Sequence, residues 1–183
     1  YKRYWGKKGG ITVSGGEALL QIDFVTELFT LAKEKGVNTC LDTSGNPFTR
    51  EEPFYSKFEK LMEVTDLFML DIKEIDEDEH KQLTGQTNKN ILDMATCLSD
   101  HGKAMWIRHV LVPGITDDGQ LHRLRAFIDT LKTVERVEIL PYHTLGVFKW
   151  KELGIPYALE DVEPPTKEQV EHAREIIIPG YKS

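Results

Sequence analysis

Short apolar runs alternate along the chain with longer segments in which apolar residues recur every three or four positions. Five runs bounded by turn residues predict buried strands, at residues 11–14, 37–42, 67–73, 104–112 and 137–141. Between the first two, Phe24, Leu28 and Leu31 share one helical face, and Gly36 is placed to end that helix. Strands that alternate with helices at this spacing are typical of a parallel sheet. The sequence therefore predicts an α/β fold.

Further helices are predicted over 54–62, after Asp76, and over 91–98, 121–131 and 166–177. Asp76 with Glu79, and Thr166 with Gln169, have the spacing of a capping box. The chain shows no linker, repeat or low-complexity tract, so residues 1–183 are expected to form one domain. The stretch 143–165 is the one long irregular connection, and such loops in compact domains are often functional.

Composition narrows the possible partners. Of the 183 residues, 40% are apolar, which is enough for a sizeable core, and 23 Lys and Arg against 30 Asp and Glu leave a net charge of −7. An acidic chain without a basic stripe does not favour nucleic acid or anionic membranes as partners. The single basic run, from Lys2 to Lys8, is expected to be a frayed end. With no apolar span or signal peptide, we expect a cytoplasmic protein.

The two cysteines, Cys40 and Cys97, are far apart in the sequence. Their number and spacing fit neither a disulfide framework nor a metal site. Both are expected to be buried apolar side chains that fill the core.

Polar residues cluster at the predicted strand ends, where parallel α/β folds bind ligands. The ends read Ser-Gly-Gly-Glu17, Asp-Thr-Ser-Gly45, Asp-Ile-Lys73, Arg108 through Gly114, and Pro-Tyr-His143. Burying such groups without partners has a cost, so a ligand or an ion is a natural partner for them.

Asp42 and Asp71 follow consecutive strands and are expected to lie close together. Two neighbouring carboxylates raise each other's pKa unless a cation separates them. Lys73 points to the same face as Asp71 in an extended strand, so it is the candidate for that cation. The alternative is that both aspartates cap turns or helix starts. Arg108 could belong to an electropositive clamp, and His143 could hydrogen-bond to a ligand. A structural ion pair for Arg108 and a satisfied core position for His143 are at least as good interpretations.

Taken together, five motifs are far more specific than any single element. They are, in order, GITVSGGE at 10–17, CLDTSG at 40–45, MLDIK at 69–73, WIRHVLVPG at 106–114 and LPYH at 140–143. Their order and spacing closely resemble pyruvate formate-lyase activating enzymes, which belong to the radical S-adenosylmethionine (SAM) superfamily. The resemblance covers nearly the whole chain, from about residue 9 to 170.

The resemblance implies a mechanism. Such enzymes hold a [4Fe–4S] cluster on a C-x3-C-x2-C loop, and an electron from the cluster cleaves SAM to methionine and a 5′-deoxyadenosyl radical. That radical removes a hydrogen atom from a glycine of pyruvate formate-lyase. The lyase, presented through its glycine loop, and a flavodoxin-like electron donor are therefore the implied partners, although the sequence leaves the donor and the particular glycyl radical enzyme open.

The same resemblance implies roles for individual residues. The implied cofactor-binding residues are Gly15, Gly16, Glu17, Asp71, Ile72, Lys73, Arg108 and His143. Glu17 is expected at the methionyl amino group, Arg108 near the charged methionyl end, and His143 beside the adenosine. A monovalent cation site near the sulfonium is implied at Asp42, Thr43, Met69 and Asp71, and oxygen ligands suit such an ion.

One departure concerns the cluster. C-x3-C-x2-C is absent, and Cys40 and Cys97 cannot replace it. The family fold is a partial (β/α)6 barrel of the TIM type, and five strands are predicted here. We therefore expect this chain to be the C-terminal portion of such a barrel, without the first βα unit and without catalytic residues of its own, while the longer parent carries the cluster.

Two other readings stay open. Asp71, Lys73 and Asp76 also fit D-x-K-x-x-D, the motif of metal-independent Asp/Lys barrel decarboxylases, but the glycine-rich phosphate site of that family is missing. The other alternative is a non-enzymatic scaffold that docks the lyase.

Overall fold

The computed structural model describes residues 9–157 and 159–182. In chain order the elements are β1 (Gly10–Val13), the 3-10 helix η1 (Ala18–Gln21), α2 (Ile22–Glu34), β2 (Asn38–Thr43), α3 (Phe54–Val64), β3 (Leu67–Asp71), α4 (Glu77–Thr84), α5 (Lys89–Asp100), β4 (Met105–Leu111), α6 (Asp118–Ile128), β5 (Val134–Pro141), α7 (Val147–Glu152) and α8 (Lys167–Ile177).

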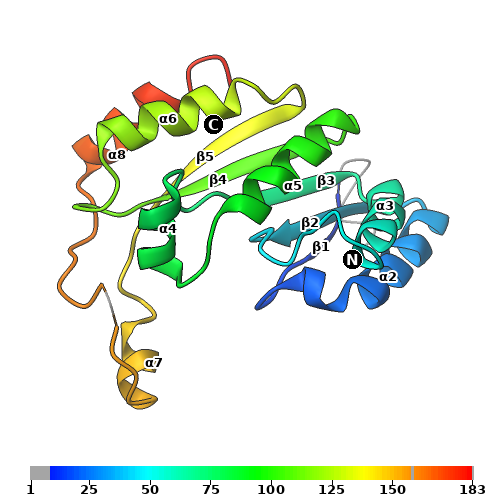
Figure 1. The fold of residues 1–183 in the computed structure, drawn as a ribbon, viewed down its shortest axis with the longest axis horizontal. Coiled ribbons are helices and arrows are strands. Elements are labelled where there is room, and N and C mark those ends of the chain that lie inside the picture. Colours follow the sequence, from blue (N-terminus) through cyan, green and yellow to red (C-terminus); the bar gives the residue numbers. More distant parts are fainter. Residues whose placement is uncertain (1–8, 158, 183) are drawn as a thin grey trace.

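The five strands form one sheet in the sequential order β1-β2-β3-β4-β5, and every neighbouring pair is parallel. Crossovers between parallel strands are right-handed, so a sheet that always advances in one direction places all its crossover helices on one face. Figure 1 shows these helices arranged around a single curved sheet. This winding confirms the predicted α/β fold and is that of a partial barrel.

The core lies between the sheet and these helices. Buried residues alternate along each central strand, as with Leu41 in β2 and Phe68 and Leu70 in β3. Asp42 and Asp71 occupy the other set of positions and are only half-buried. Alternate residues of a strand point to opposite faces. The covered face is therefore apolar, and the inner face of the partial barrel carries the polar residues.

Backbone register brings these polar residues together at the carboxyl edge of the sheet. Asp71 on β3 is the register partner of Arg108 on β4, and Asp42 on β2 is the partner of Met69 on β3. Gly45, just after β2, has φ of +73°, and a Cβ on it would lie 2.8 Å from Leu70 Cδ1. Only glycine allows the chain to turn this closely over the core.

The structure differs from the predicted elements mainly at their boundaries. β5 begins at Val134, earlier than expected, and β3 ends at Asp71, so Lys73 follows the strand instead of lying in it. The connection after His143, predicted to be irregular, contains α7. The helix after Asp76 is confirmed, but Asp76 accepts from the Asp78 and Glu79 amides without a reciprocal bond from the Glu79 side chain.

The two cysteines differ in burial. Cys97 is buried as predicted, whereas Cys40 is half-buried, because it sits at an inner-face position of β2. The basic run from Lys2 to Lys8 lies outside the described residues. In the described part of the chain, no helix combines the length and the apolar character needed to cross a membrane.

Candidate functional site

The carboxyl ends of β1 to β4 surround a polar cavity of about 210 Å³. Its lining residues are Ser14, Gly15, Gly16, Glu17, Asp42, Thr43, Ser44, Asp71, Lys73 and Arg108. Four separate sequence motifs therefore meet in one place. Ile72, Met69 and His143 are not part of this lining.

A second cavity of about 240 Å³ adjoins the first and shares Gly16, Ser44, Asp71 and Lys73 with it. The residues that line only this second cavity are Asn46, His80, Thr84, Gln86 and Ile91. They come from the loop after β2 and from the α4–α5 region, so they extend the site across the carboxyl edge. Lys73 is the cation common to both spaces.

Glu17 connects the ends of β1 and β2. One of its carboxylate oxygens accepts hydrogen bonds from the Leu19 amide at 3.0 Å and from the Thr43 hydroxyl. The other accepts from the Ser44 amide at 2.9 Å and from the Ser44 hydroxyl. A carboxylate has about four acceptor sites, and here protein donors use all of them. Glu17 thus caps η1 and holds the two strand ends together, and its expected contact with an amino group competes with these donors.

Arg108 bridges the two aspartates of the site. Its Nη2 lies 2.7 Å from Asp71 Oδ1, its Nε donates to the same oxygen at 2.8 Å, and the guanidinium also forms an ion pair with Asp42. The two carboxylates do meet, as predicted, but the cation between them is Arg108 and not Lys73. The reason is register, because β4 places Arg108 directly beside Asp71, whereas Lys73 lies beyond the end of β3.

Burial and charge act in opposite directions on these groups. Burial raises the pKa of Asp71, even though the Arg108 and Lys73 charges oppose it. Burial alone would lower the pKa of Arg108, but Asp71 and Asp42 outweigh this effect and raise it. Arg108 therefore stays charged, and a proton taken up in this cluster would go to a carboxylate such as Asp71.

The remaining predicted site residues lie apart from the cavity lining. The Ile72 side chain is fully buried in the core, and its carbonyl oxygen faces His109 Nδ1 at 2.9 Å, so Ile72 could meet a ligand only through its backbone. His143 is exposed just beyond the end of β5. Its expected place beside an adenosine stays a prediction.

Sequence reasoning missed His80 and Asn46. His80 is buried on α4, where burial lowers its pKa, and its Nδ1 has no hydrogen-bond partner among the described residues. The capping pattern at Asp76 predicted this helix but not which face it turns to the strand ends. Asn46 directly follows the CLDTSG motif at 40–45, and that position was the available signal.

The described residues do not fit an iron–sulfur cluster. Cys97 lies on α5, where its Sγ is 3.8 Å from the Tyr55 hydroxyl, while Cys40 is on the inner face of β2. In the described part of the chain, no group of three or more His, Cys, Asp or Glu side chains is arranged to hold a metal ion. Three cysteine ligands are needed for such a cluster in this family, and the sequence has two cysteines in total.

The family model of the radical SAM superfamily matches residues 1–125. The chain is 58% identical over 178 residues to the pyruvate formate-lyase-activating enzyme of Streptococcus mutans, covering 97% of this chain and 68% of that protein. The chain belongs to the radical SAM superfamily, in the family of pyruvate formate-lyase-activating enzymes. A relative of the same name from Listeria monocytogenes is 51% identical over 97% of this chain and 72% of its own length.

Solved structures show the same fold. A domain of pyruvate-formate lyase-activating enzyme from Bacteroides vulgatus matches with a TM-score of 0.76 at 21% identity, covering 95% of this chain and 96% of that one. A radical SAM methyltransferase from Sphaerobacter thermophilus matches with a TM-score of 0.62 at 15% identity, covering 94% and 49%. These matches agree with the partial barrel expected of this family.

The decarboxylase reading is not supported. Its motif needs Asp76 beside Asp71 and Lys73, but the Asp76 carboxylate accepts hydrogen bonds from the Asp78 and Glu79 amides as the cap of α4. Asp76 is also absent from the lining of both cavities at the strand ends.

Proposed function

We propose that this protein acts in the activation of pyruvate formate-lyase by formation of a glycyl radical, and that it binds SAM at the carboxyl edge of its sheet. The observation that carries the proposal is the cavity where Glu17, Asp71, Lys73 and Arg108 converge, together with membership of the activating-enzyme family. Pyruvate formate-lyase is the proposed protein substrate because the relatives are named for activating it.

The charges of this cavity suit a ligand that carries both signs. SAM has an ammonium, a sulfonium and a carboxylate. Asp42 and Asp71 offer negative charge for its cationic groups, while Lys73 and Arg108 offer positive charge for the carboxylate. Each cavity alone is smaller than a typical ligand site, but the two share four lining residues, so a ligand that reaches past these residues could use both.

Several parts of the activity lie beyond these residues. The described part of the chain does not supply ligands for the cluster. A flavodoxin-like electron donor and a cytoplasmic location are also proposals, drawn from the family. Another glycyl radical enzyme as substrate is the alternative to pyruvate formate-lyase.

A monovalent cation at Asp42, Asp71 and the main-chain carbonyls of Thr43 and Met69 is likewise a proposal. The Arg108 guanidinium already pairs with both carboxylates, so a cation would have to displace one of its contacts. Potassium should then strengthen SAM binding in the wild type. An affinity that is the same with and without potassium would argue against the site.

Calorimetric titration with SAM tests the proposed binding, with S-adenosylhomocysteine and ribose 5-phosphate as comparison ligands. Binding is expected to be weak, because the described residues supply no ligands for a cluster whose iron would hold the methionyl group. SAM should still bind more tightly than either comparison ligand. Lys73→Met should weaken binding, whereas Lys57→Met, at an exposed ion pair with Asp23 on another part of the surface, should not. Preference for the phosphate, or no binding of SAM, would contradict the proposal.

A further inference from the structure

A short segment after β5 exposes an unusual amount of apolar surface. We call residues 145–155 the projection; it contains α7 and stands away from the rest of the fold in Figure 1. The exposed large apolar side chains of the projection are Leu145, Phe148, Trp150, Leu153 and Ile155. Among described residues only three others are comparably exposed, and all three belong to η1 and α2.

The projection contributes little to the core. Helix α7 has six residues and none of them is buried. A helix this short is unstable by itself in water, so contacts at its base must hold it. Trp150 packs on Tyr157 with ring centroids 5.4 Å apart, and Lys151 pairs with Glu160 at 3.0 Å. These two contacts connect α7 to the segment that follows it, while its apolar side chains stay exposed to solvent.

Position links the projection to the candidate site. It starts two residues after His143, at the carboxyl edge that carries the cavity of Asp71 and Arg108. The Tyr142 hydroxyl donates to the Leu159 carbonyl at 3.2 Å and so joins the segments that precede and follow the projection. Any large molecule that approaches the site from this side meets the projection.

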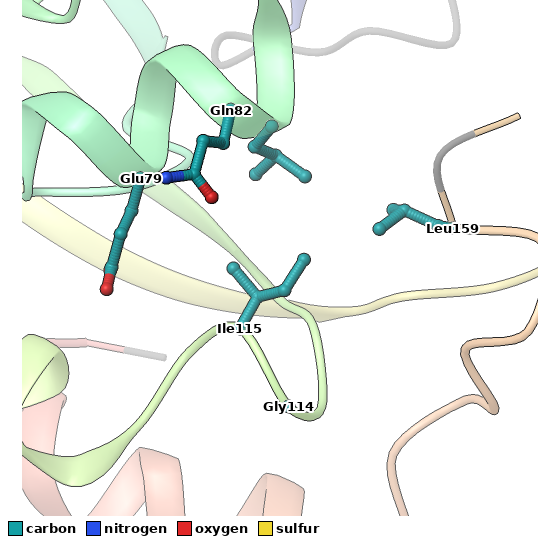
Figure 2. A pocket seen from close by; sticks show the side chains of 6 residues that line it. Glu79, Gln82, Gly114, Ile115 and Leu159 are labelled. Carbon is teal, nitrogen blue, oxygen red and sulfur yellow. The ribbon is translucent and has the colours of Figure 1, made fainter.

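A cavity of about 290 Å³ lies beside Leu159, which follows the projection in the chain; we refer to it as the cavity at the root of the projection. It is lined by Glu79, Gln82, Leu83, Gly114, Ile115 and Leu159. Figure 2 shows Gln82 of α4, Ile115 of the loop after β4 and Leu159 around the same space. An open space whose walls combine polar side chains with Leu83, Ile115 and Leu159 can accept an anchoring side chain from a docked protein.

We propose that the projection and the cavity at its root are the docking surface for the protein substrate, pyruvate formate-lyase. This inference rests on the proposed function, because a glycine within a large protein must be brought to the carboxyl edge. Exposed aromatic side chains are typical of the centre of protein interfaces. Lys149 and Lys151 outnumber Glu152, the one acidic residue of the projection, in a chain of net charge −7, so the projection suits an acidic protein surface.

The test compares two matched double variants of this chain by interferometry on immobilised lyase. One is Phe148→Ser with Leu153→Ser in the projection, where the side chains are 55% and 71% exposed. The control is Phe24→Ser with Leu20→Ser, at 60% and 75% exposure, on α2 and η1. The projection variant should bind the lyase at least about tenfold more weakly, or about 1.4 kcal/mol, with the control unchanged. Circular dichroism and SAM titration of both variants should match the wild type.

The possible outcomes separate the inference from the proposed function. Equal binding by the projection variant, or a loss confined to the control, overturns the docking surface while SAM binding still supports the function. Failure of the wild type to bind the lyase overturns the docking inference outright. Sedimentation completes the test, because a dimer that the projection variant abolishes, with lyase binding intact, would assign the surface to a second copy of this chain. Hydrogen exchange of the wild-type complex should show protection over residues 145–155, independently of any variant.

Discussion

The guanidinium of Arg108 lies 2.7 Å from the Asp71 carboxylate, and backbone register on adjacent strands brings the two residues together. Arg108 also pairs with Asp42, so a single cation holds two carboxylates at the carboxyl edge of the sheet. These three side chains are 17–21% exposed, which means that water screens them only in part. Their pairing is therefore expected to matter for stability as well as for ligand binding.

Replacing Arg108 tests the pairing. Arg108→Ala leaves two partly buried carboxylates without their cation and should lower the free energy of unfolding by about 3 kcal/mol, measured in urea. Arg50→Ala removes an ion pair with Asp93 whose partners are 45% and 44% exposed, and should cost less than about 1 kcal/mol. Equal effects from the two substitutions would show that the Arg108 cluster is no stronger than a surface pair.

Glu17 provides a second test, of the connection between β1 and β2. Glu17→Gln keeps the size of the side chain but replaces one acceptor oxygen by a donor. The Leu19 or the Ser44 amide N–H then loses its acceptor. The expected loss is about 1–2 kcal/mol of unfolding free energy. Glu34→Gln, at an exposed position of α2, serves as the control and should have little effect. Unchanged stability of Glu17→Gln would mean that these hydrogen bonds do not hold the strand ends.

The turn at Gly45 separates backbone strain from crowding. Gly45 and Gly85 have similar positive φ, +73° and +77°, but an added Cβ meets Leu70 at 2.8 Å only at Gly45. Gly85→Ala should cost about 1 kcal/mol for backbone strain, and Gly45→Ala should cost a further 1–3 kcal/mol or so for overpacking. Chemical denaturation measures both, and the difference between them is the informative quantity.

Histidine burial predicts a pH dependence of stability. Burial lowers the pKa of His109, whose side chain is 1% exposed, so the unfolded chain takes up a proton at higher pH than the folded chain. This contribution is present above the unfolded pKa of about 6.5 and is lost as the pH falls below it. Denaturant unfolding from about pH 7.5 to about pH 5.5 should show the decline, and His109→Gln should reduce it.

His172 supplies the opposite sign within the same chain. Asp118 accepts from its ring at 2.9 Å and raises its pKa, so its contribution is present at low pH and is lost as the pH rises through the raised value. His172→Gln should therefore steepen the decline of stability on acidification. A shallower decline in this variant would contradict the assigned direction.

Much of the site could be predicted because strand ends are marked by sequence. Apolar runs that lead into Asp42 and into Asp71 through Lys73 indicated both the strands and the edge where their polar residues meet. The identity of the neutralising cation could not be predicted, since it depends on the register between β3 and β4, which no local pattern reports. The hydrogen bonds that Thr43 and Ser44 donate to the Glu17 carboxylate could not be predicted for the same reason, because they join the ends of separate strands.

Helix α7 could not be predicted from the sequence for a different reason. Its residues have no buried face, so they lack the apolar periodicity that indicated α2 and α8. The exposed Phe148 and Trp150 belong to no pattern of the core. A function in docking explains such residues better than a function in folding, and folding patterns are what sequence reasoning detects most easily.

SAM is proposed to bind at the carboxyl edge around Asp71, Lys73 and Arg108. Hydrogen exchange of the chain with and without saturating SAM tests it most directly, because it reports where a weakly bound ligand acts. Slower exchange is expected in the segments 14–17, 42–46 and 71–73, which line the shared cavities. Protection confined to the cavity of Ile115 and Leu159, or none at any segment of the edge, would contradict the account.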